Sequence, residues 1–301
     1  MELAPRALRR ARTDGLVAAL ALLLLSACAT DRPAGQATAL GGEAAAGPVR
    51  VVPQRDWSDA VLYFVILDRF ADGNTANNTN VQRANPGGFH GGDFVGLTQQ
   101  LDEIASLGAT AIWITPVPRQ IDYCPPSQAP PGITVEGGWF EHCAFHGYWT
   151  DDFQTIDPRF GSEAEFKALV DAAHAHGLPV IYHGCGNVKS IFPDYIEMGI
   201  DAYNPLEVKA GMDAVELRRQ YGHRIGFCGN NDIQVWEAGD RAALRREVLR
   251  KLNAAKGGGM IFQSDHSVSS SVSGHTYDYI VTLVREYGKY PLQLGEFDEA
   301  V

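Results

Sequence analysis

Residues 162–182, SEAEFKALVDAAHAHGLPVIY, carry the pattern that decides the fold. Ser162 and Glu165 have the spacing of a helical capping box, and Gly177 provides a helix end. Between them, four apolar residues recur at the helical period: Phe166, Leu169, Val170 and Ala173. The run LPVIY that follows is typical of a strand buried on both faces. The stretch therefore predicts a helix followed by a strand of a parallel sheet.

Further apolar runs of the same kind lie on either side, separated by amphipathic helical stretches. They are residues 61–67 (VLYFVIL), 110–115 (TAIWIT), 200–204 (IDAYN), 224–228 (RIGFC) and 259–263 (GMIFQ). Asp213 and Asp240 are plausible helix N-caps. The alternation predicts an α/β fold of the parallel β/α barrel type. About six strand–helix units are present, so we expect the barrel to be incomplete, since a closed one has eight strands.

Composition narrows the function. The chain has 301 residues, of which 45% are hydrophobic and 20% charged, and its formal net charge is −11. These fractions are ordinary for a folded protein. An acidic chain is a poor partner for a phosphate backbone, so we expect no nucleic-acid binding.

The first 50 residues read as an export signal and a tether. A basic stretch precedes the apolar run LVAALALLLL at 16–25, and the sequence LSAC follows at 25–28. This end resembles a bacterial lipoprotein box, which implies that residues 1–27 are removed and that Cys28 is lipidated. An ordinary signal peptide is the alternative. Residues 28–50 have the composition of a flexible tether. We therefore expect an exported lipoprotein held to a membrane by its N-terminal lipid, in the periplasm or at the cell surface.

Short oxygen-bearing side chains crowd the loop after the first strand, DRFADGNTANN at 68–78. Carboxylates and carboxamides are the ligands that Ca²⁺ prefers. Asn and Asp are also common turn formers, so the loop alone leaves both interpretations open.

The loop belongs to a longer resemblance to the α-amylase superfamily, glycoside hydrolase family 13, and especially to cyclodextrin glucanotransferases. The stretches that carry it span residues 57–181 and include HGGDFVGL at 90–97, LGATAIWITPV at 107–117 and FHGYWTDDFQTIDPRFG at 145–161. The resemblance implies a TIM-barrel fold and carbohydrate metabolism, with an α-glucan as ligand. It also implies a calcium site whose ligands are Asp72, Asn74, Asn77, Asn78, the backbone oxygen of Gly91, and Asp93.

The resemblance gives Tyr148 a role in substrate binding, as the aromatic ring that stacks on a sugar; a core aromatic is the alternative. The catalytic set of the family is missing. No stretch after residue 181 resembles the strands that carry the nucleophilic Asp, the acid/base Glu and the third Asp. Retaining cleavage of a glycosidic bond needs two facing carboxyl groups.

Residues 181–291 resemble a different family, the C-terminal part of the uroporphyrinogen decarboxylase superfamily, which includes cobamide-dependent methyltransferases. The stretches are HGCGNVKSIFPDYIEMGIDAYNPLE at 183–207, AGMDAVELRRQYGHRIGFCGNNDIQ at 210–234 and residues 257–291. The resemblance implies that His183 and Cys185 are zinc ligands and that His266 is an active-site histidine. Two protein ligands fall short of the three or four of a zinc site, so we expect weak Zn²⁺ binding. Alternatively, the three are ordinary residues at strand ends.

The chain is therefore composite, with an amylase-like barrel segment at 51–181 and a decarboxylase-like one at 182–301. The join falls within the predicted strand at 178–182, and the chain could be a natural fusion or a chimera. Cys124 and Cys143 bracket a Pro- and Gly-rich loop, which in an exported protein suggests a disulfide, with free thiols as the alternative.

Both catalytic sets are incomplete, so the sequence leaves enzymatic activity undecided. Our leading interpretation is an exported calcium-binding lipoprotein without glycosidase activity. The alternatives are a decarboxylase- or methyltransferase-like enzyme acting on tetrapyrrole or methyl-transfer substrates, and an α-glucan hydrolase or transferase.

Overall fold

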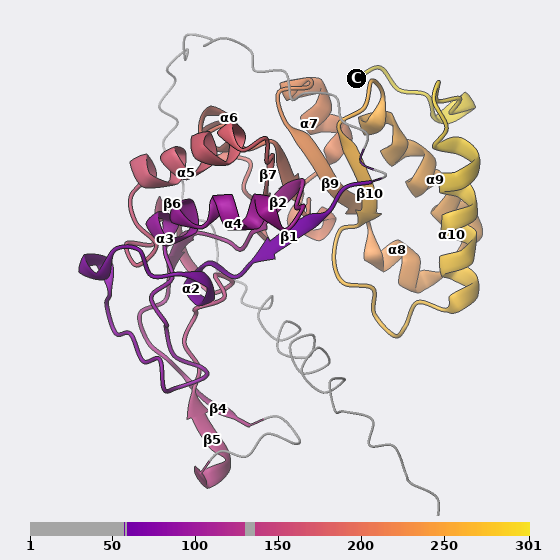
Figure 1. Cartoon of the computed structure of the whole chain (residues 1–301). Helices are drawn as coiled ribbons and strands as arrows, with labels where there is room; N and C mark the ends of the chain where they lie inside the picture. The colour runs from indigo at the N-terminus through magenta and orange to yellow at the C-terminus, as the bar shows by residue number, and fades with distance from the viewer. Residues whose placement is uncertain (1–56, 58, 130–135) are drawn as a thin grey trace, which may run out of the picture.

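A six-stranded parallel sheet forms the centre of the protein (Figure 1). The computed structural model describes residues 57, 59–129 and 136–301. The strands follow the order β1-β2-β7-β8-β9-β10. Their bounds are β1 Leu62–Val65, β2 Ala111–Ile114, β7 Val180–His183, β8 Ala202–Asn204, β9 Gly226–Asn231 and β10 Met260–Ser264. Each coincides with a strand predicted from the sequence, and every pairing within the sheet is parallel.

Helices connect the strands. They are α2 Leu67–Phe70, α3 Phe94–Gln99, α4 Leu101–Ser106, α5 Glu163–Ala175, α6 Phe192–Glu197, α7 Ala214–Tyr221, α8 Ile233–Ala238, α9 Arg241–Leu252 and α10 Gly274–Tyr287. The predicted helix starts are confirmed. Ser162 and Glu165 form both bonds of the capping box of α5, and the carboxylates of Asp213 and Asp240 cap α7 and α9.

The segment between β2 and α5, treated as a loop in the sequence analysis, contains two small antiparallel sheets. Strand β3 (Pro118–Gln120) pairs with β6 (Thr150–Ile156), and β4 (Pro126–Gln128) pairs with β5 (Trp139–Glu141). The β4–β5 pair projects from the body of the molecule (Figure 1). A disulfide joins Cys124 to Cys143 at its base, as predicted.

The two largest of four hydrophobic clusters in the described part of the chain stabilise the sheet and its helices. The larger one includes Val180 and Tyr182 of β7, Ile112 and Ile114 of β2, and Phe166 of α5, all essentially inaccessible to solvent. The smaller one consists of side chains from α8, α9, α10 and the C-terminal segment. Strand β7 lies between β2 and β8, so the strand at which the two resemblances meet is paired on both sides.

The sheet is open within the described part of the chain, with β1 and β10 at its edges. The incomplete barrel predicted from the sequence is therefore confirmed. Because β1 is an edge strand, it leaves apolar side chains in contact with solvent: Leu62 and Phe64 are 41% and 48% exposed. Trp57 packs with Ile181, Ala202 and Cys228 on the same side of the sheet as Phe64, whose ring meets that of Trp113.

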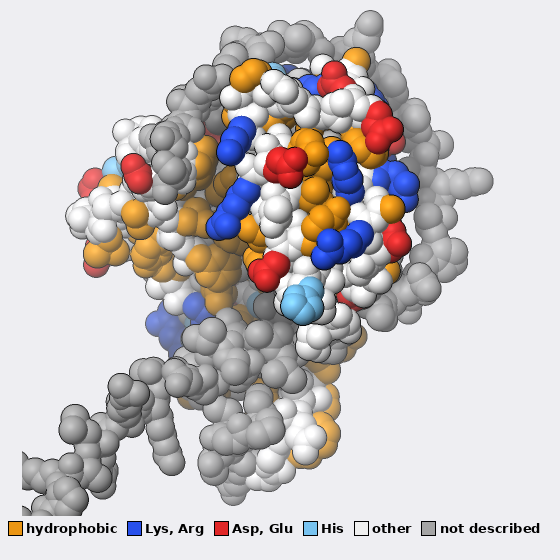
Figure 2. All heavy atoms as spheres, turned by 90° about the vertical axis from the view of Figure 1, so that its right-hand side faces the viewer, with side chains coloured by type: hydrophobic (Ala, Val, Ile, Leu, Met, Phe, Trp, Pro, Cys, Tyr) orange, Lys and Arg blue, Asp and Glu red, His pale blue; other side chains and the backbone are white. Residues whose placement is uncertain are grey.

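The face on the side of α9 and α10 carries basic and acidic side chains interspersed with hydrophobic ones (Figure 2). No helix among the residues placed by the structure is long and apolar enough to cross a membrane. The predicted signal peptide, Cys28 and the tether lie outside the described residues.

Candidate functional site

The loop after β1 gathers side-chain oxygens that have no partner. Asp72 Oδ1, Asn77 Oδ1 and Asn78 Oδ1 are buried and accept no hydrogen bond. A buried acceptor without a partner costs free energy, so three in one loop require an explanation. They belong to three of the six predicted calcium ligands.

The other acidic ligand, Asp93, holds the loop in shape. Its side chain is fully buried, and its Oδ1 accepts hydrogen bonds from the backbone N–H of Gly73 at 3.1 Å and of Gly96 at 2.6 Å. Its Oδ2 accepts from the backbone of Asn74 at 2.8 Å and from Asn77 Nδ2 at 3.3 Å. The bond to Gly96 caps α3. One carboxylate therefore ties residues 73–77 to the start of α3.

Gly91 adjoins the same cluster. Its φ is +88°, which favours glycine, and a Cβ at this position would lie 2.5 Å from Asn78 Oδ1 and 3.2 Å from Asp72 Oδ2. Asn74 is nearby through its backbone bond to Asp93, but its Oδ1 accepts from the backbone N–H of Ala76 at 3.2 Å. Asp72, Asn77 and Asn78 thus each keep one unpaired oxygen, whereas Asn74 Oδ1 and both carboxylate oxygens of Asp93 already accept hydrogen bonds.

These residues fit a calcium ion. The donor set is all oxygen, with two carboxylates and several neutral carbonyl groups, and three of the oxygens are buried and unpaired. Within the described ranges, no three His, Cys, Asp or Glu side chains form a metal-binding group. The loop contributes only two such residues, so its amides would have to supply most of the ligands.

A second polar cluster lies at the carboxyl ends of β7 and β8. His183 ends β7, and its Nδ1 is 2.6 Å from Asn204 Oδ1 at the end of β8. Cys185 Sγ is 4.0 Å from His183 Nε2. Burial lowers the pKa of His183 to about 4, while the bond to Asn204 opposes this and the charge of His266 adds to it. His183 and Cys185 are therefore neighbours, with a neutral His183 imidazole at neutral pH, whereas His266 is linked to them only through its electrostatic influence on His183.

A cavity of about 480 Å³ opens beside Cys185. Tyr148 and Phe153 from the amylase-like segment line it together with Tyr203, Cys185 and Glu207 from the other segment. Tyr148 stacks on His146 and meets the ring of His183 edge-on at 5.3 Å. It is thus partly packed and still reaches the cavity, which is compatible with both of its predicted roles.

Cys228, the last residue of the predicted strand at 224–228, does not supply the third zinc ligand that His183 and Cys185 lack. It lies within β9, 3% exposed, and burial raises the pKa of its thiol to about 12. Such a thiol is a poor metal ligand at neutral pH, because binding requires the thiolate.

Sequence reasoning missed Glu207, which follows β8. Its side chain is 3% exposed; Oε2 accepts from the backbone of Gly186 at 2.8 Å, and Oε1 lies 3.1 Å from Lys209 Nζ. The available signal was its place just past a predicted strand, where barrel enzymes place functional side chains.

Comparison with known proteins confirms the composite resemblance. Residues 64–197 match the alpha amylase catalytic domain family, and residues 162–287 match the uroporphyrinogen decarboxylase (URO-D) family. The two matches overlap at 162–197, which comprises α5, β7 and α6 and includes the predicted join. The chain therefore joins an alpha-amylase-like front to a URO-D-like back.

The similar proteins include an alpha-amylase and a cyclomaltodextrin glucanotransferase. The periplasmic alpha-amylase of Escherichia coli (strain K12) is 39% identical over 134 residues, which cover 42% of this chain and 18% of the relative. The cyclomaltodextrin glucanotransferase of Thermoanaerobacterium thermosulfurigenes is 33% identical over 155 residues, which cover 48% of this chain and 21% of the relative. The chain spans about a fifth of the length of these relatives.

Among solved structures, the cyclomaltodextrin glucanotransferase CldA aligns with a TM-score of 0.49 at 16% identity, covering 76% of this chain and 61% of that one. An alpha-amylase from Malbranchea cinnamomea aligns with a TM-score of 0.43 at 16% identity, covering 75% and 58%. At these scores the likeness adds nothing to the sheet topology described above.

Proposed function

We propose that the protein is an exported calcium-binding lipoprotein whose amylase-like segment retains a calcium-stabilised loop and cleaves no α-glucan. The observation that carries the calcium part is the set of three buried, unpaired oxygens on Asp72, Asn77 and Asn78. Asp93 and the carbonyl of Gly91 complete the side of the site next to α3.

A bound calcium ion would supply positive charge and oxygen coordination between the loop after β1 and the turn at 91–93. Two carboxylates, Asp72 and Asp93, balance its charge, so no net charge is buried. The chain's own contribution is to hold the oxygens in place through the backbone bonds to Asp93.

Thermal melting tests this part. An ion that binds only the folded state stabilises it by about 2.7 kcal/mol at a hundredfold excess over Kd, which raises the melting temperature by several degrees. Asp72→Ala should lose most of this gain. Thr79→Ala, an exposed neighbour outside the ligand set, should retain it. Identical melting of the parent in calcium and in chelator would refute the calcium proposal.

The absence of glycosidase activity is proposed from the residues at the strand ends. Strands β8 and β9 end in Asn204 and Asn231, amides that cannot serve as a nucleophile or as a general acid. Loss of one acid/base group commonly costs at least about 100-fold in rate. We expect a calcium-loaded sample to release no reducing ends from starch, maltodextrin or pullulan above a heat-killed control, and clear release would refute this part. Starch retention without cleavage would support an α-glucan as ligand at Tyr148.

Export is supported by the periplasmic relative, and the lipid anchor by the LSAC sequence at 25–28. Expressed in a bacterium with its own signal, the protein should incorporate labelled palmitate, and the Cys28→Ser variant should not. Equal labelling of both would contradict the anchor.

A second candidate is a URO-D- or methyltransferase-like enzyme. The 4.0 Å approach of Cys185 Sγ to His183 Nε2, inside the matched segment, favours it. We expect Zn²⁺ to be lost on dialysis, because only two ligands are in place. Stoichiometric zinc that survives dialysis, and is lost in Cys185→Ala, would favour this enzyme over the inactive protein.

A further inference from the structure

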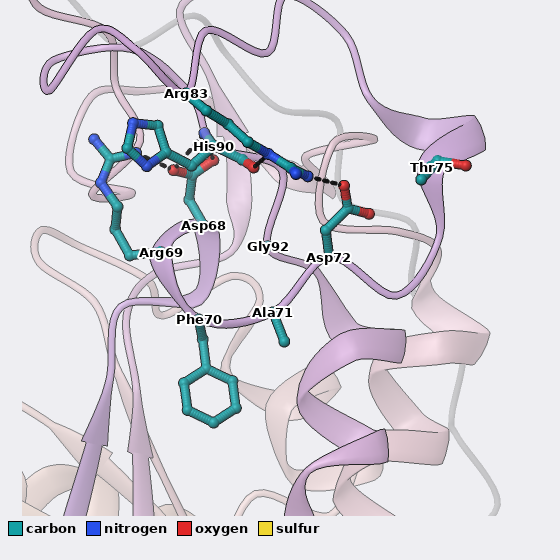
Figure 3. A pocket seen from close by; sticks show the side chains of 9 residues that line it. All are labelled: Asp68, Arg69, Phe70, Ala71, Asp72, Thr75, Arg83, His90 and Gly92. Carbon is teal, nitrogen blue, oxygen red and sulfur yellow. Dashed lines mark hydrogen bonds and ion pairs between the residues drawn. The ribbon is translucent and has the colours of Figure 1, made fainter.

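Arg83 lies next to the proposed calcium site and is not one of the predicted ligands. Its guanidinium forms an ion pair with Asp72 Oδ2, the same oxygen that accepts from Asn78 Nδ2 at 2.7 Å. Its Nε donates to the backbone oxygen of His90 at 3.0 Å. Both residues line a cavity of about 500 Å³, and Figure 3 shows the side chain of Arg83 pointing toward the carboxylate of Asp72.

These contacts connect the two segments that supply the ligands. Asp72 belongs to the loop after β1, whereas His90 immediately precedes Gly91, whose carbonyl is the predicted backbone ligand. A single arginine thus contacts both segments, next to the loop in which Asp72, Asn77 and Asn78 each have an unpaired buried oxygen.

We propose that Arg83 is a positioning residue that acts as a resident counter-cation: it stabilises the calcium-free loop and weakens calcium binding. This inference rests on the proposed calcium site. Without the ion, the positive charge of Arg83 offsets that of Asp72. With the ion, a third positive charge faces two carboxylates, and its repulsion opposes binding.

Arg83 thus stabilises the calcium-free protein and opposes calcium binding. The size of both effects depends on how far the side chains of Arg83 and Asp72 are exposed to solvent. The side chain of Arg83 is 60% exposed and that of Asp72 11% exposed, so water and salt screen the repulsion strongly. Near a surface, a unit charge beside a divalent ion is worth about a three- to tenfold change in affinity. The benefit to the calcium-free protein is that of one partly exposed ion pair with an added hydrogen bond, so it is small.

The experiment compares the parent, Arg83→Gln, Arg83→Lys and the control Arg119→Gln by calcium titration under equilibrium dialysis and by melting in chelator. Arg119 makes a similar exposed ion pair with Asp151 on β6, away from the loop. We expect Arg83→Gln to bind calcium about three- to tenfold more tightly and to melt at a lower temperature in chelator. Arg83→Lys keeps the charge and should bind with parental affinity, and Arg119→Gln should match the parent in both measurements. Because the effect is electrostatic, the gain in affinity should shrink in 1 M KCl, where the Debye length is about 3 Å.

The two possible failures can be distinguished. A parent that takes up no calcium in dialysis refutes the proposed function and this inference with it. A parent that binds calcium, beside an Arg83→Gln variant that binds it equally or more weakly, overturns the inference alone and leaves the calcium site in place.

Discussion

The loop after β1 and the carboxyl ends of β7 to β10 are both rich in polar side chains, and they differ in how those side chains are satisfied. In the loop, three buried oxygens accept no hydrogen bond. At the strand ends, Asn231 Oδ1 and Glu207 Oε1 also accept no hydrogen bond, but Glu207 Oε1 pairs with Lys209, and other buried polar groups bond to one another or to the backbone. Asp265 accepts from the backbone of Val208 and of Ile233, each at 2.9 Å, and Asn230 Oδ1 accepts from Ala214 and from Lys251.

The difference distinguishes the loop, which has the features of a ligand-binding site, from strand-end residues that stabilise the fold. Unpaired buried acceptors are costly, and a folded protein retains them where a ligand supplies the missing partner. Asp265 and Asn230 need no such partner, because their bonds already join the strand ends to Val208, to the first residues of α7 and α8, and to Lys251 of α9. Asp265 and Asn230 therefore carry less functional information than the loop does.

The largest effect in this comparison of loop and strand ends is expected from substitution of Asp93. Asp93→Ala leaves three backbone N–H groups and one amide without their acceptor, so we expect a loss of about 3–5 kcal/mol in unfolding free energy even in chelator. Urea unfolding with and without calcium measures it. Thr79→Ala is the control, and a loss below 1 kcal/mol would show that Asp93 does not organise the loop.

Asp265 gives the matching test in the other segment. Asp265→Ala leaves two backbone N–H groups without an acceptor, so we expect urea unfolding to show a loss of about 2 kcal/mol in unfolding free energy. The loss should be the same in calcium and in chelator, since this carboxylate only holds the fold. A loss that changed with calcium would show that the strand ends also respond to the ion.

The junction strand gives a pH test. The pKa of His183 falls to about 4 on folding through burial, below the usual value of 6.5. The unfolded chain therefore binds a proton that the folded one does not, and stability is lost as pH falls from about 6.5 toward 4. When the pH falls from 7 to 5, the unfolding free energy of His183→Gln should decrease by about 2 kcal/mol less than that of the parent.

His176→Gln is the control for this test, because bonds to the carbonyl of Ala172 and to Asp102 raise the pKa of His176. That substitution should not protect the protein from acid. Equal acid sensitivity of His183→Gln and the parent would mean that His183 is solvated in solution.

The smallest effect concerns the helix that both family matches include. Ser162→Ala removes the N-cap of α5, a helix that lies within both matches. We expect the unfolding free energy to decrease by about 1 kcal/mol, which lowers the melting temperature. Ser106→Ala, at the exposed C-terminal end of α4, should cost less. If the two cost the same, the capping box contributes nothing to the segment that joins the two halves.

The sequence by itself determined the strands of the central sheet and their order along the chain. Apolar runs and helix caps such as Ser162 are local signals, which is why all six strands and three helix starts were predicted correctly. The calcium ligand set came from the resemblance, and it remains a prediction that the unpaired oxygens support.

Only the tertiary structure decided which polar groups lack partners and which residues reach them from a distance. Arg83 meets Asp72 across 11 residues, and Asn204 meets His183 across 21 residues, between two neighbouring strands. The β3–β6 and β4–β5 pairings likewise join segments with weak strand patterns. Such contacts depend on strand register and on the path of the backbone through space, so no local pattern encodes them.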